Sequence, residues 1–513
     1  MSNISVQVNY KPLLWFIGGF GAFIFTRVMN YIPIALPVGA LLILRFSRSR
    51  KTFKGVLLTV SGFIISILAS ELFPLPASEA AFIIFHILKL TVKGIFFSLP
   101  YLIDRIVYKK PDGFLRTLVF PVAAVTVYFL DSTLGLFKGT AFYYAFMQYG
   151  SSSLVQFLSI AGIWGTGFIL LWSSSVVCWI LENGFEWKII RKGVSVYVGI
   201  ILLVFAYGGI RTSPMFYAYS GKTVTTASII LAEISPMEVF EKLDGRKFSD
   251  LNLVVPEIEK RVRQAAGAGA EIAALQEFAA IIPQEEEDAF IGRMRRIATD
   301  NSIYLCVNYV SLPPRHSGRH DYSFGLIELD DGEEGKNKAL LIDSNGEIKI
   351  EYTKRHVNLL EGNYILESSS EQIPVADTAF GRIGVVVCKD MEYSRFMRQA
   401  AQKHADLIIA PSSEATRALA ITYSQMLRAV EYGFSFIRPC SYGLSVAVDY
   451  HGNILASSNS FTSPGNTMYA EVPVPGTSTL YGITGDLFAW ICCSVFFLFL
   501  LHILYTGLKD MKK

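Results

Sequence analysis

Three residues that can take part in covalent chemistry each come at the end of a strand-like run. Cys388 ends one such run, and Glu277 and Lys354 directly follow two others. The carboxyl ends of strands are where layered α/β folds place functional groups. A thiol can attack a carbonyl carbon, a carboxylate can take the thiol proton, and an ammonium can neutralise the developing oxyanion. Together the three residues predict a Glu-Lys-Cys catalytic set.

Each of these residues also has a simpler interpretation when it is considered alone. Free cysteines are among the most buried residue types, so Cys388 could be structural. Glu277 could begin a helix, where a carboxylate interacts favourably with the helix dipole. Lys354 could be a solvated surface charge. The occurrence of all three types at strand ends is what favours the catalytic interpretation.

The segment 212–485 alternates β-rich apolar runs with polar helical stretches, which is typical of a layered α/β domain. Strands are predicted at 224–233, 271–276, 303–310, 338–343, 347–353, 383–388, 406–410, 435–440, 443–449 and 466–472. Helices are predicted at 256–267, 285–300, 393–404 and 417–433.

Outside this segment the chain is strongly apolar. Its 513 residues are 52% hydrophobic and 17% charged, and the apolar excess lies before Thr212 and after Gly485. A helix needs roughly 17 to 25 mostly apolar residues to cross a bilayer. Eight candidate spans are predicted, seven before the α/β segment and one after it, at 13–28, 31–44, 56–73, 80–107, 115–130, 153–181, 194–210 and 487–504.

Two of these spans fit least well. The span 31–44 is short and contains two prolines, and the span 80–107 is long and contains Lys89 and Lys93, so either could be interfacial or re-entrant. The expected organisation is a helical membrane bundle at 1–211, a catalytic domain at 212–485, and a last span with a short basic tail at 486–513.

The distribution of cations predicts the orientation. Short cytoplasmic loops retain Lys and Arg. The loops after the second, fourth, sixth and eighth spans are rich in these residues, whereas 74–79 has none and 131–152 has only Lys138. An N-terminus inside the cell and residues 212–485 on the outer face satisfy this alternation.

Other signals exclude several classes of function. A net charge of +3 gives no reason to expect a nucleic-acid partner. Six cysteines are too few for a disulfide scaffold, and buried free thiols fit Cys306 and Cys440 better than a disulfide does. His316, His320 and Asp321 have helical metal-ligand spacing, but the adjoining prolines and glycine predict a loop, so no metal site is expected.

Four blocks resemble those of the nitrilase superfamily in their chain order: 266–277, 352–356, Gly384-Val-Val-Val-Cys388-Lys-Asp390 and 405–412. A fifth stretch, from Arg428 to Asp449, is also similar. Seven predicted spans before such a domain and one after it resemble the apolipoprotein N-acyltransferases of bacterial envelopes.

Two membrane segments are similar to the span motifs of that acyltransferase family. Phe120-Pro121 leads to Asp131, and Gln156 is followed by a glycine-rich stretch at 162–168. Asp131 lies near the predicted outer end of its span, where a carboxylate is either an ordinary boundary residue or a substrate contact.

The resemblance implies a membrane α-helical bundle joined to an α-β-β-α sandwich domain, with a role for each matching position. Glu277 would be the general base, Lys354 the oxyanion stabiliser and Cys388 the acylated nucleophile. Glu361 would be a second carboxylate near the Glu–Lys pair, and Lys389 and Asp390 would be further supporting residues.

The implied reaction has two steps and needs no cofactor or metal. A phospholipid ester acylates the cysteine, and the N-terminal amine of a lipoprotein's diacylglyceryl cysteine then takes the acyl group as an amide. The implied setting is a monomer in the bacterial inner membrane, multi-pass, with its catalytic domain on the extracytoplasmic face. The spans would then form a route by which an acyl chain reaches the nucleophile, and simple anchoring is the alternative.

The chain departs from the acyltransferases around these positions. Gln276 replaces the proline usual before the catalytic glutamate, and Lys389-Asp390 replaces Tyr-Glu after the cysteine. The stretch 413–420 lacks the usual lid sequence, and 232–240 lacks the expected tryptophan. Because the three reacting groups are unaffected, the resemblance supports the type of reaction more firmly than it supports the identity of the acceptor. A membrane-anchored amidohydrolase, which passes the acyl group to water, is the alternative function.

Overall fold

The computed structural model describes residues 10–26, 32–50, 52–71, 80–135, 138–140, 143, 148, 152–213, 222–231, 236–245, 247–313, 335–357, 361–363, 365–414 and 419–511. The chain divides into two compact units. One is Met1–Ile210 together with Asp486–Lys513, and the other is Arg211–Gly485.

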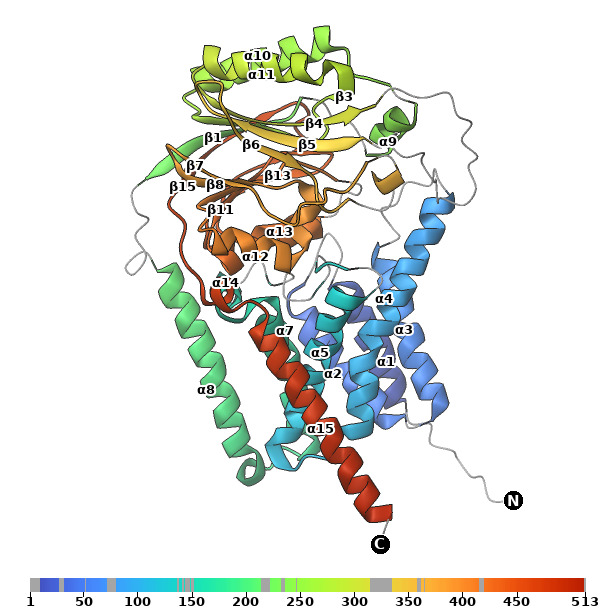
Figure 1. Cartoon of the computed structure of the whole chain (residues 1–513). Helices are drawn as coiled ribbons and strands as arrows, with labels where there is room; N and C mark the ends of the chain where they lie inside the picture. The colour runs from blue at the N-terminus through green and yellow to red at the C-terminus, as the bar shows by residue number, and fades with distance from the viewer. Residues whose placement is uncertain are drawn as a thin grey trace, which may run out of the picture. The chain divides into compact units, whose positions relative to one another are not determined.

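The first unit is built from helices, and a helix is found at each predicted span. These are α1 (Lys11–Ile24), α2 (Ala35–Ser49), α3 (Phe53–Glu71), α4 (Ala80–Val107), α5 (Val119–Leu134), α7 (Leu158–Glu182), α8 (Trp187–Thr212) and α15 (Leu487–Met511) (Figure 1). A short helix, α6 (Ser152–Val155), precedes α7.

Five helices in the described part of the chain are long and apolar enough to cross a membrane: α3, the segment Gly113–Leu134 that contains α5, α7, α8 and α15. Helices α1 and α2 have 14 and 15 residues, fewer than the roughly 17 to 25 that a span needs. Helix α4 is long but carries both lysines and acidic and basic residues near its end. The predicted number of eight spans is therefore not confirmed.

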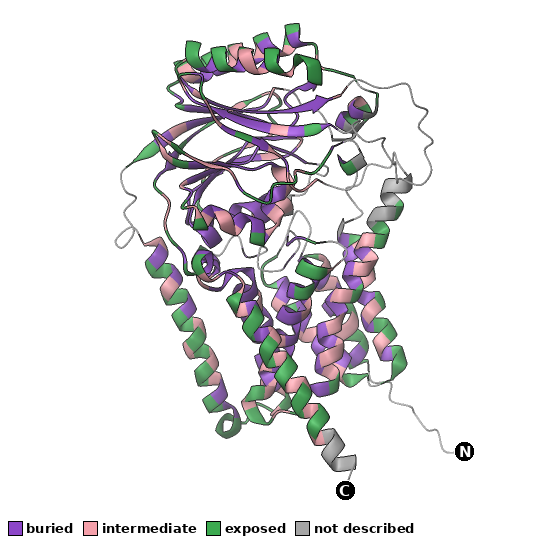
Figure 2. Cartoon of the chain, viewed as in Figure 1, coloured by how far each residue is buried: buried purple, intermediate pink, exposed green. Residues whose placement is uncertain are grey.

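Helices α8 and α15 expose most of their apolar side chains, as Figure 2 shows. In the most apolar stretch of each helix, only 17% of the residues of α8 and 11% of those of α15 are buried. A helix that is apolar on its exposed faces suits contact with lipid.

The interior of the helical unit holds a buried ion pair. Lys93 on α4 lies 2.5 Å from Asp131 on α5, measured from Nζ to Oδ2. The Tyr143 hydroxyl donates to the same carboxylate oxygen at 2.9 Å. Asp131 is therefore buried and paired within the unit.

The second unit contains two sheets. The first runs in the order β15 (Thr467–Pro473), β1 (Thr223–Ile229), β2 (Ile272–Leu275), β4 (Tyr304–Leu312), β5 (Lys336–Ile342) and β6 (Ile348–Thr353), with β3 (Ile281–Pro283) paired to β4. The second runs in the order β14 (Ile454–Asn459), β13 (Leu444–Val448), β11 (Ser435–Arg438), β9 (Leu407–Ile409), β8 (Gly381–Val385) and β7 (Val375–Thr378). A short parallel pair, β10 (Ser412–Ser413) and β12 (Cys440–Ser441), accompanies them.

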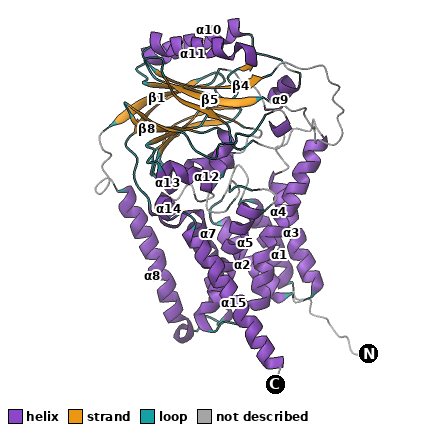
Figure 3. Cartoon of the chain, viewed as in Figure 1, coloured by secondary structure: helices purple, strands orange, loops and turns teal. Residues whose placement is uncertain are grey.

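Helices cover the outer face of each sheet, so the unit is an α-β-β-α sandwich (Figure 3). Helices α10 (Leu251–Gly267) and α11 (Glu287–Asp300) lie on the first sheet. Helices α12 (Ser394–Gln402) and α13 (Leu419–Tyr432) lie on the second. Residues such as Ile258 and Val262 recur four apart on α10 and are fully buried in the core, because this spacing places them on one helix face.

All ten predicted strands and all four predicted helices of this unit overlap observed elements, which confirms them. Five strands were not predicted: β3, β7, β10, β12 and β14. Two helices were also not predicted, α9 (Pro236–Asp244) and α14 (Leu480–Thr484). Most of these elements are too short to show a hydrophobic period.

Some predicted features lie outside the described residues. They are His316, His320 and Asp321, the loop 74–79, and parts of the stretches 232–240 and 413–420.

Candidate active site

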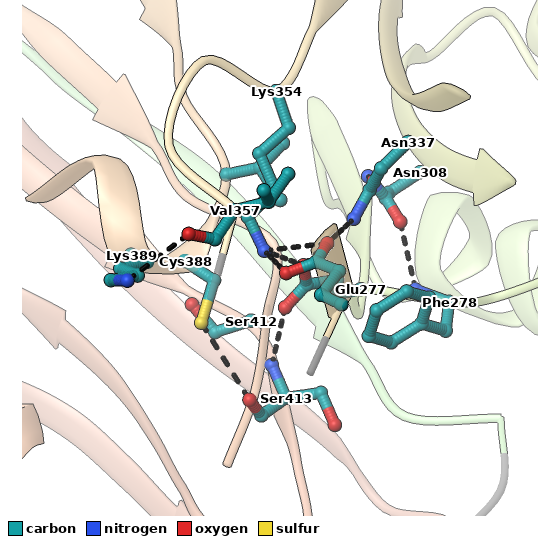
Figure 4. Close-up of polar contacts among 12 residues, drawn as sticks. Glu277, Phe278, Asn308, Asn337, Lys354, Val357, Cys388, Lys389, Ser412 and Ser413 are labelled. Carbon is teal, nitrogen blue, oxygen red and sulfur yellow. Dashed lines mark hydrogen bonds and ion pairs between the residues drawn. The ribbon is translucent and has the colours of Figure 1, made fainter. Parts of the chain in front are cut away.

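The three candidate catalytic residues follow strands of both sheets. Glu277 comes two residues after β2, and Lys354 comes directly after β6 of the same sheet. Cys388 follows β8 of the other sheet and begins a 3-10 turn, Cys388–Glu392. The fold brings the three side chains together in one place, as Figure 4 shows.

Lys354 lies between two buried carboxylates. Its Nζ is 2.8 Å from Oε1 of Glu277, and 2.9 and 2.7 Å from the two oxygens of Glu361. All three side chains are almost completely buried. The spatial prediction for Glu361, a second carboxylate near the Glu–Lys pair, is therefore met.

Asn337 also connects the two carboxylates. Its Nδ2 group donates to Oε1 of Glu277 at 2.9 Å and to Oε1 of Glu361 at 3.0 Å. Its own oxygen accepts from Asn308 at 2.7 Å, and Asn308 in turn accepts from the backbone N–H of Phe278 at 2.7 Å. This chain of amides holds the backbone next to Glu277, where Phe278 has a φ of 58°.

Sequence reasoning missed both asparagines. Both are fully buried: Asn308 lies in a mostly apolar strand, whereas Asn337 lies between two lysines at the start of its strand. Buried amides need hydrogen-bond partners. A lone Asn in an apolar strand was therefore a signal for Asn308, but nothing local in the sequence pointed to Asn337.

Cys388 is the most accessible of the three candidate residues. It is only partly buried, and its backbone has a left-handed φ of 44°. Such a conformation is unusual for a residue with a side chain, and strained residues cluster at functional sites.

The backbone of Ser413 joins the cysteine to the glutamate. The Cys388 thiol donates to the Ser413 carbonyl at 3.6 Å, and the Ser413 N–H donates to Oε2 of Glu277 at 3.0 Å. Figure 4 shows both contacts. The backbone of one residue, Ser413, therefore orients both groups: its carbonyl orients the thiol and its N–H orients the carboxylate.

Burial and neighbouring charges together set the protonation of the site. Burial raises the pKa of Glu277; Lys354 opposes this rise and Glu361 adds to it. Burial alone would lower the pKa of Lys354, but the carboxylates of Glu277 and Glu361 outweigh it and raise that pKa well above its usual value. Burial, with Glu277, also raises the pKa of the Cys388 thiol well above its usual value, against the effect of Lys354. The resting cysteine is thus a thiol that needs a base, beside a lysine that stays charged.

Lys389 and Asp390 brace the neighbouring loop and do not contact the Glu–Lys pair. Lys389 donates from Nζ to the carbonyl of Val357 at 3.1 Å. Asp390 is fully buried and accepts from the Tyr352 hydroxyl at 2.8 Å and from the His356 backbone N–H at 2.9 Å. These contacts tie the turn that carries the cysteine to the segment that follows Lys354.

Gln276 has a structural contact that a proline could not make. Its side-chain oxygen accepts from the backbone N–H of Leu231 at 2.6 Å, just beyond the end of β1. This contact accounts for one of the departures from the acyltransferase pattern.

Among the described residues, no group of three or more His, Cys, Asp or Glu side chains is arranged to hold a metal ion. The described cysteines are free thiols, including Cys306 and Cys440.

Residues 235–480 match the carbon-nitrogen hydrolase family. An apolipoprotein N-acyltransferase from Geobacter metallireducens is 22% identical over 360 residues, which cover 68% of this chain. The match spans 66% of that protein, slightly less than two thirds of its length. The probable hydrolase nit2 of Schizosaccharomyces pombe is 24% identical over 245 residues, 41% of this chain and 82% of that protein. These matches confirm the resemblance to the nitrilase superfamily and to the acyltransferases.

Solved structures match about half of the chain. An amidase from Nesterenkonia sp. is 20% identical, with a TM-score of 0.36 over 49% of this chain and 91% of the amidase. Saccharomyces cerevisiae Nit3, a member of branch 10 of the nitrilase superfamily, is 17% identical, with a TM-score of 0.39 over 49% of this chain and 90% of Nit3.

Proposed function

We propose that the chain is a membrane N-acyltransferase. Residues 235–480 match the carbon-nitrogen hydrolase family, and apolar helices precede and follow them. The enzyme moves a fatty acyl group from a phospholipid to a thioester on Cys388, and then to the N-terminal amine of a lipoprotein.

One observation carries this proposal. The thiol of Cys388 lies near a lysine whose ammonium is held by two buried carboxylates. One of these carboxylates accepts the N–H of Ser413, whose carbonyl accepts a hydrogen bond from the thiol. A nucleophile, a base and a fixed positive charge in one place are what acyl transfer through a covalent intermediate requires.

In the first half-reaction, Glu277 takes the thiol proton and the Cys388 sulfur attacks the ester carbonyl carbon. The negative charge that develops on the carbonyl oxygen is stabilised by the ammonium of Lys354 and by the backbone N–H of Lys389. When the tetrahedral intermediate collapses, the C–O bond of the ester breaks. Glu277 returns the proton to the departing alkoxide, which leaves as a lysophospholipid.

In the second half-reaction, the acceptor amine attacks the thioester carbonyl. Glu277 takes a proton from the amine nitrogen, and the C–S bond breaks to form the amide. The Cys388 thiolate leaves and recovers the proton from Glu277. A thioester suits this step because a thiolate is a better leaving group than an alkoxide, so an amine can displace it.

The apolar helices support a lipid substrate. One helix is enough to hold a domain at a membrane. Five helices in the described residues are long and apolar enough to span, and the helical unit also holds the buried ion pair of Lys93 and Asp131. We infer that this bundle admits a phospholipid in addition to anchoring the enzyme.

The direct test uses purified, detergent-solubilised protein, a phospholipid with an isotopically labelled acyl chain, and a diacylated lipopeptide with a free N-terminal amine. The expected product is a triacylated peptide that carries the label. A second lipopeptide with an acetylated N-terminus is the control and should not react.

An amidohydrolase is the second candidate, and the match of residues 235–480 to the carbon-nitrogen hydrolase family and the similarity to the probable hydrolase nit2 support it. This activity would release labelled fatty acid with no peptide product, or would act on small soluble amides alone. Either result would reject the transferase.

A further inference from the structure

The backbone of Cys388 is held at both ends in its left-handed conformation. Its N–H donates to the carbonyl of Pro411 at 3.0 Å. Its carbonyl accepts from the side-chain amide of Gln425, on α13, at 3.3 Å. Backbone conformations of this kind persist only when the surrounding structure stabilises them.

Arg438 fixes which way the Gln425 amide points. The guanidinium Nε donates to the Gln425 oxygen at 2.7 Å. Arginine has only donors, so Gln425 must present its oxygen to Arg438 and is left with its NH₂ group facing the Cys388 carbonyl. Both side chains are almost fully buried, so water does not compete for these bonds.

The same arginine is tied to the strand that orients the thiol. Arg438 forms a buried ion pair with Glu414. Glu414 directly follows Ser413, whose carbonyl accepts a hydrogen bond from the thiol and whose N–H donates to Glu277. Arg438 therefore connects to both sides of the nucleophile, through Gln425 on one side and through Glu414 on the other.

We propose that Gln425 and Arg438 are positioning residues for the nucleophile. Arg438 orients the Gln425 amide, and the amide holds the Cys388 carbonyl so that the sulfur stays beside Lys354. The inference rests on the proposed function in one respect only, namely that Cys388 is the nucleophile. It does not depend on which acyl group or acceptor the enzyme uses.

Four charged groups from four different elements face the cysteine. Glu277 follows β2, Lys354 follows β6, Glu414 follows β10, and Arg438 lies on β11. The carboxylates of Glu277 and Glu414 raise the pKa of the thiol, after burial, and Lys354 and Arg438 lower it. A displaced sulfur would change its distance from these charges, and this makes the positioning measurable.

The experiment measures the rate of Cys388 alkylation by iodoacetamide as a function of pH, using the full-length protein in detergent and peptide mass spectrometry. In Gln425→Leu, the thiol is no longer fixed beside the ammonium of Lys354. The pH of half-maximal alkylation should rise by about one unit. At a given pH below the midpoint, this rise corresponds to about a tenfold lower fraction of thiolate.

A second variant gives a shift of opposite sign. Glu414→Gln keeps an oxygen for Arg438 but removes a negative charge that faces the thiol, so its midpoint should fall. It checks that the midpoint reports the charges that face the thiol. If Gln425→Leu does not fold, Gln425→Asn tests the same contact, because the shorter amide cannot reach both Arg438 and the Cys388 carbonyl, and its midpoint should also rise.

Gln399→Leu is the matched control. Gln399 is also a helical glutamine whose amide joins backbone groups of a loop, at 2.7 Å to the carbonyl of Glu371 and 3.1 Å from the N–H of Ile373. It has no part in the cysteine network, so its loss should lower the melting temperature and leave the alkylation profile unchanged.

An unchanged midpoint in Gln425→Leu, with only a lower melting temperature, would overturn the positioning role. A higher midpoint in Glu414→Gln would also contradict it. If Cys388 in the unmodified protein is not alkylated at any pH, the nucleophile itself is wrongly assigned, and the proposed function fails together with this inference.

Discussion

Lys354 donates to two carboxylates, and the two carboxylates bind its ammonium in different ways. Glu361 binds the ammonium through both of its oxygens. Glu277 binds it through Oε1, while among the described residues its Oε2 accepts only the N–H of Ser413. A carboxylate oxygen can accept two hydrogen bonds, so Oε2 of Glu277 can still receive a proton.

The first prediction concerns the nucleophile. Cys388→Ala should abolish transfer, because it removes the sulfur while changing the side-chain volume little. Cys388→Ser should be nearly as inactive, because a serine hydroxyl is far less acidic than a thiol and Glu277 cannot readily deprotonate it. The loss should be about a thousandfold or more, as for other catalytic nucleophiles.

The assay is the rate of formation of labelled triacylated peptide, with circular dichroism as the control for folding. A Cys388→Ala protein that folds and keeps normal activity would show that the nucleophile lies elsewhere.

A second prediction concerns pH. Burial and the Glu361 carboxylate both raise the pKa of Glu277, and Glu277 must be ionised to act as a base. The acid limb of kcat/KM should therefore lie above the pH at which an ordinary glutamate ionises. Glu361→Gln removes a negative charge that raises the pKa of Glu277, so the acid limb of kcat/KM should move to lower pH.

The rate of acylation of Cys388 across the acid range measures this limb. An acid limb that stays in place or moves to higher pH in Glu361→Gln would mean that Glu277 is not the base that limits the reaction.

At the residue scale, the sequence predicted the place of the three candidate residues in the fold better than the contacts that hold them. Glu277, Lys354 and Cys388 were selected because each lies at the end of a strand-like run, and position along a strand is a local property. Asn337 and Gln425 could not be selected in this way, because their roles depend on partners that lie 60 and 37 positions away in the chain. Only the folded sheets bring those partners within hydrogen-bond distance.

Among the elements, the pair formed by α4 and α5 departs most from a simple membrane span. The lysines of α4 weakened its prediction as a span, and Asp131 was expected at a boundary. The structure explains two of these residues together, because Lys93 and Asp131 neutralise each other inside the helical unit. Nothing local in the sequence linked them, since they are 38 residues apart on different helices.

A third prediction follows from this pair. Lys93→Met alone or Asp131→Leu alone leaves a buried charge without its ionic partner and should destabilise the helical unit by about 3–5 kcal/mol. The double variant removes both charges and should be close to the unmodified protein in stability, because apolar replacements of buried ion pairs are often neutral.

Thermal unfolding in detergent measures the three variants. If the double variant is less stable than either single variant, the two residues do not compensate each other and the pair is wrongly described.

The elements that frame the site were only partly predictable. Strands β2, β6 and β8 are apolar runs and were expected. Strands β10 and β12 have two residues each, and they exist because the backbone of Ser412 and Ser413 pairs with Cys440 and Ser441. Such pairing is a consequence of the tertiary fold and leaves no periodic pattern in the sequence.

At the scale of the whole molecule, the chain has a helical unit and a sandwich unit, and the candidate active site lies in the sandwich unit. The fourth prediction is that residues 212–485 lie outside the cytoplasm and that the loop 45–54 lies inside. The cation-rich loops alternate in a way that requires this orientation.

Accessibility labelling of single engineered cysteines, one near residue 50 and one in the sandwich unit, tests the orientation in intact cells. Labelling of the first from outside only would reverse the orientation and place the chemistry in the cytoplasm.

The central claim is that one acyl group passes through Cys388 on its way from phospholipid to amine. Intact-protein and peptide mass spectrometry can follow this directly. After incubation with labelled phospholipid alone, Cys388 should carry one acyl group. When the diacylated lipopeptide is then added, the adduct should disappear as an equal amount of triacylated peptide forms. Transfer to the peptide with no adduct on Cys388 at any time, or loss of the adduct only as free fatty acid, would contradict the account.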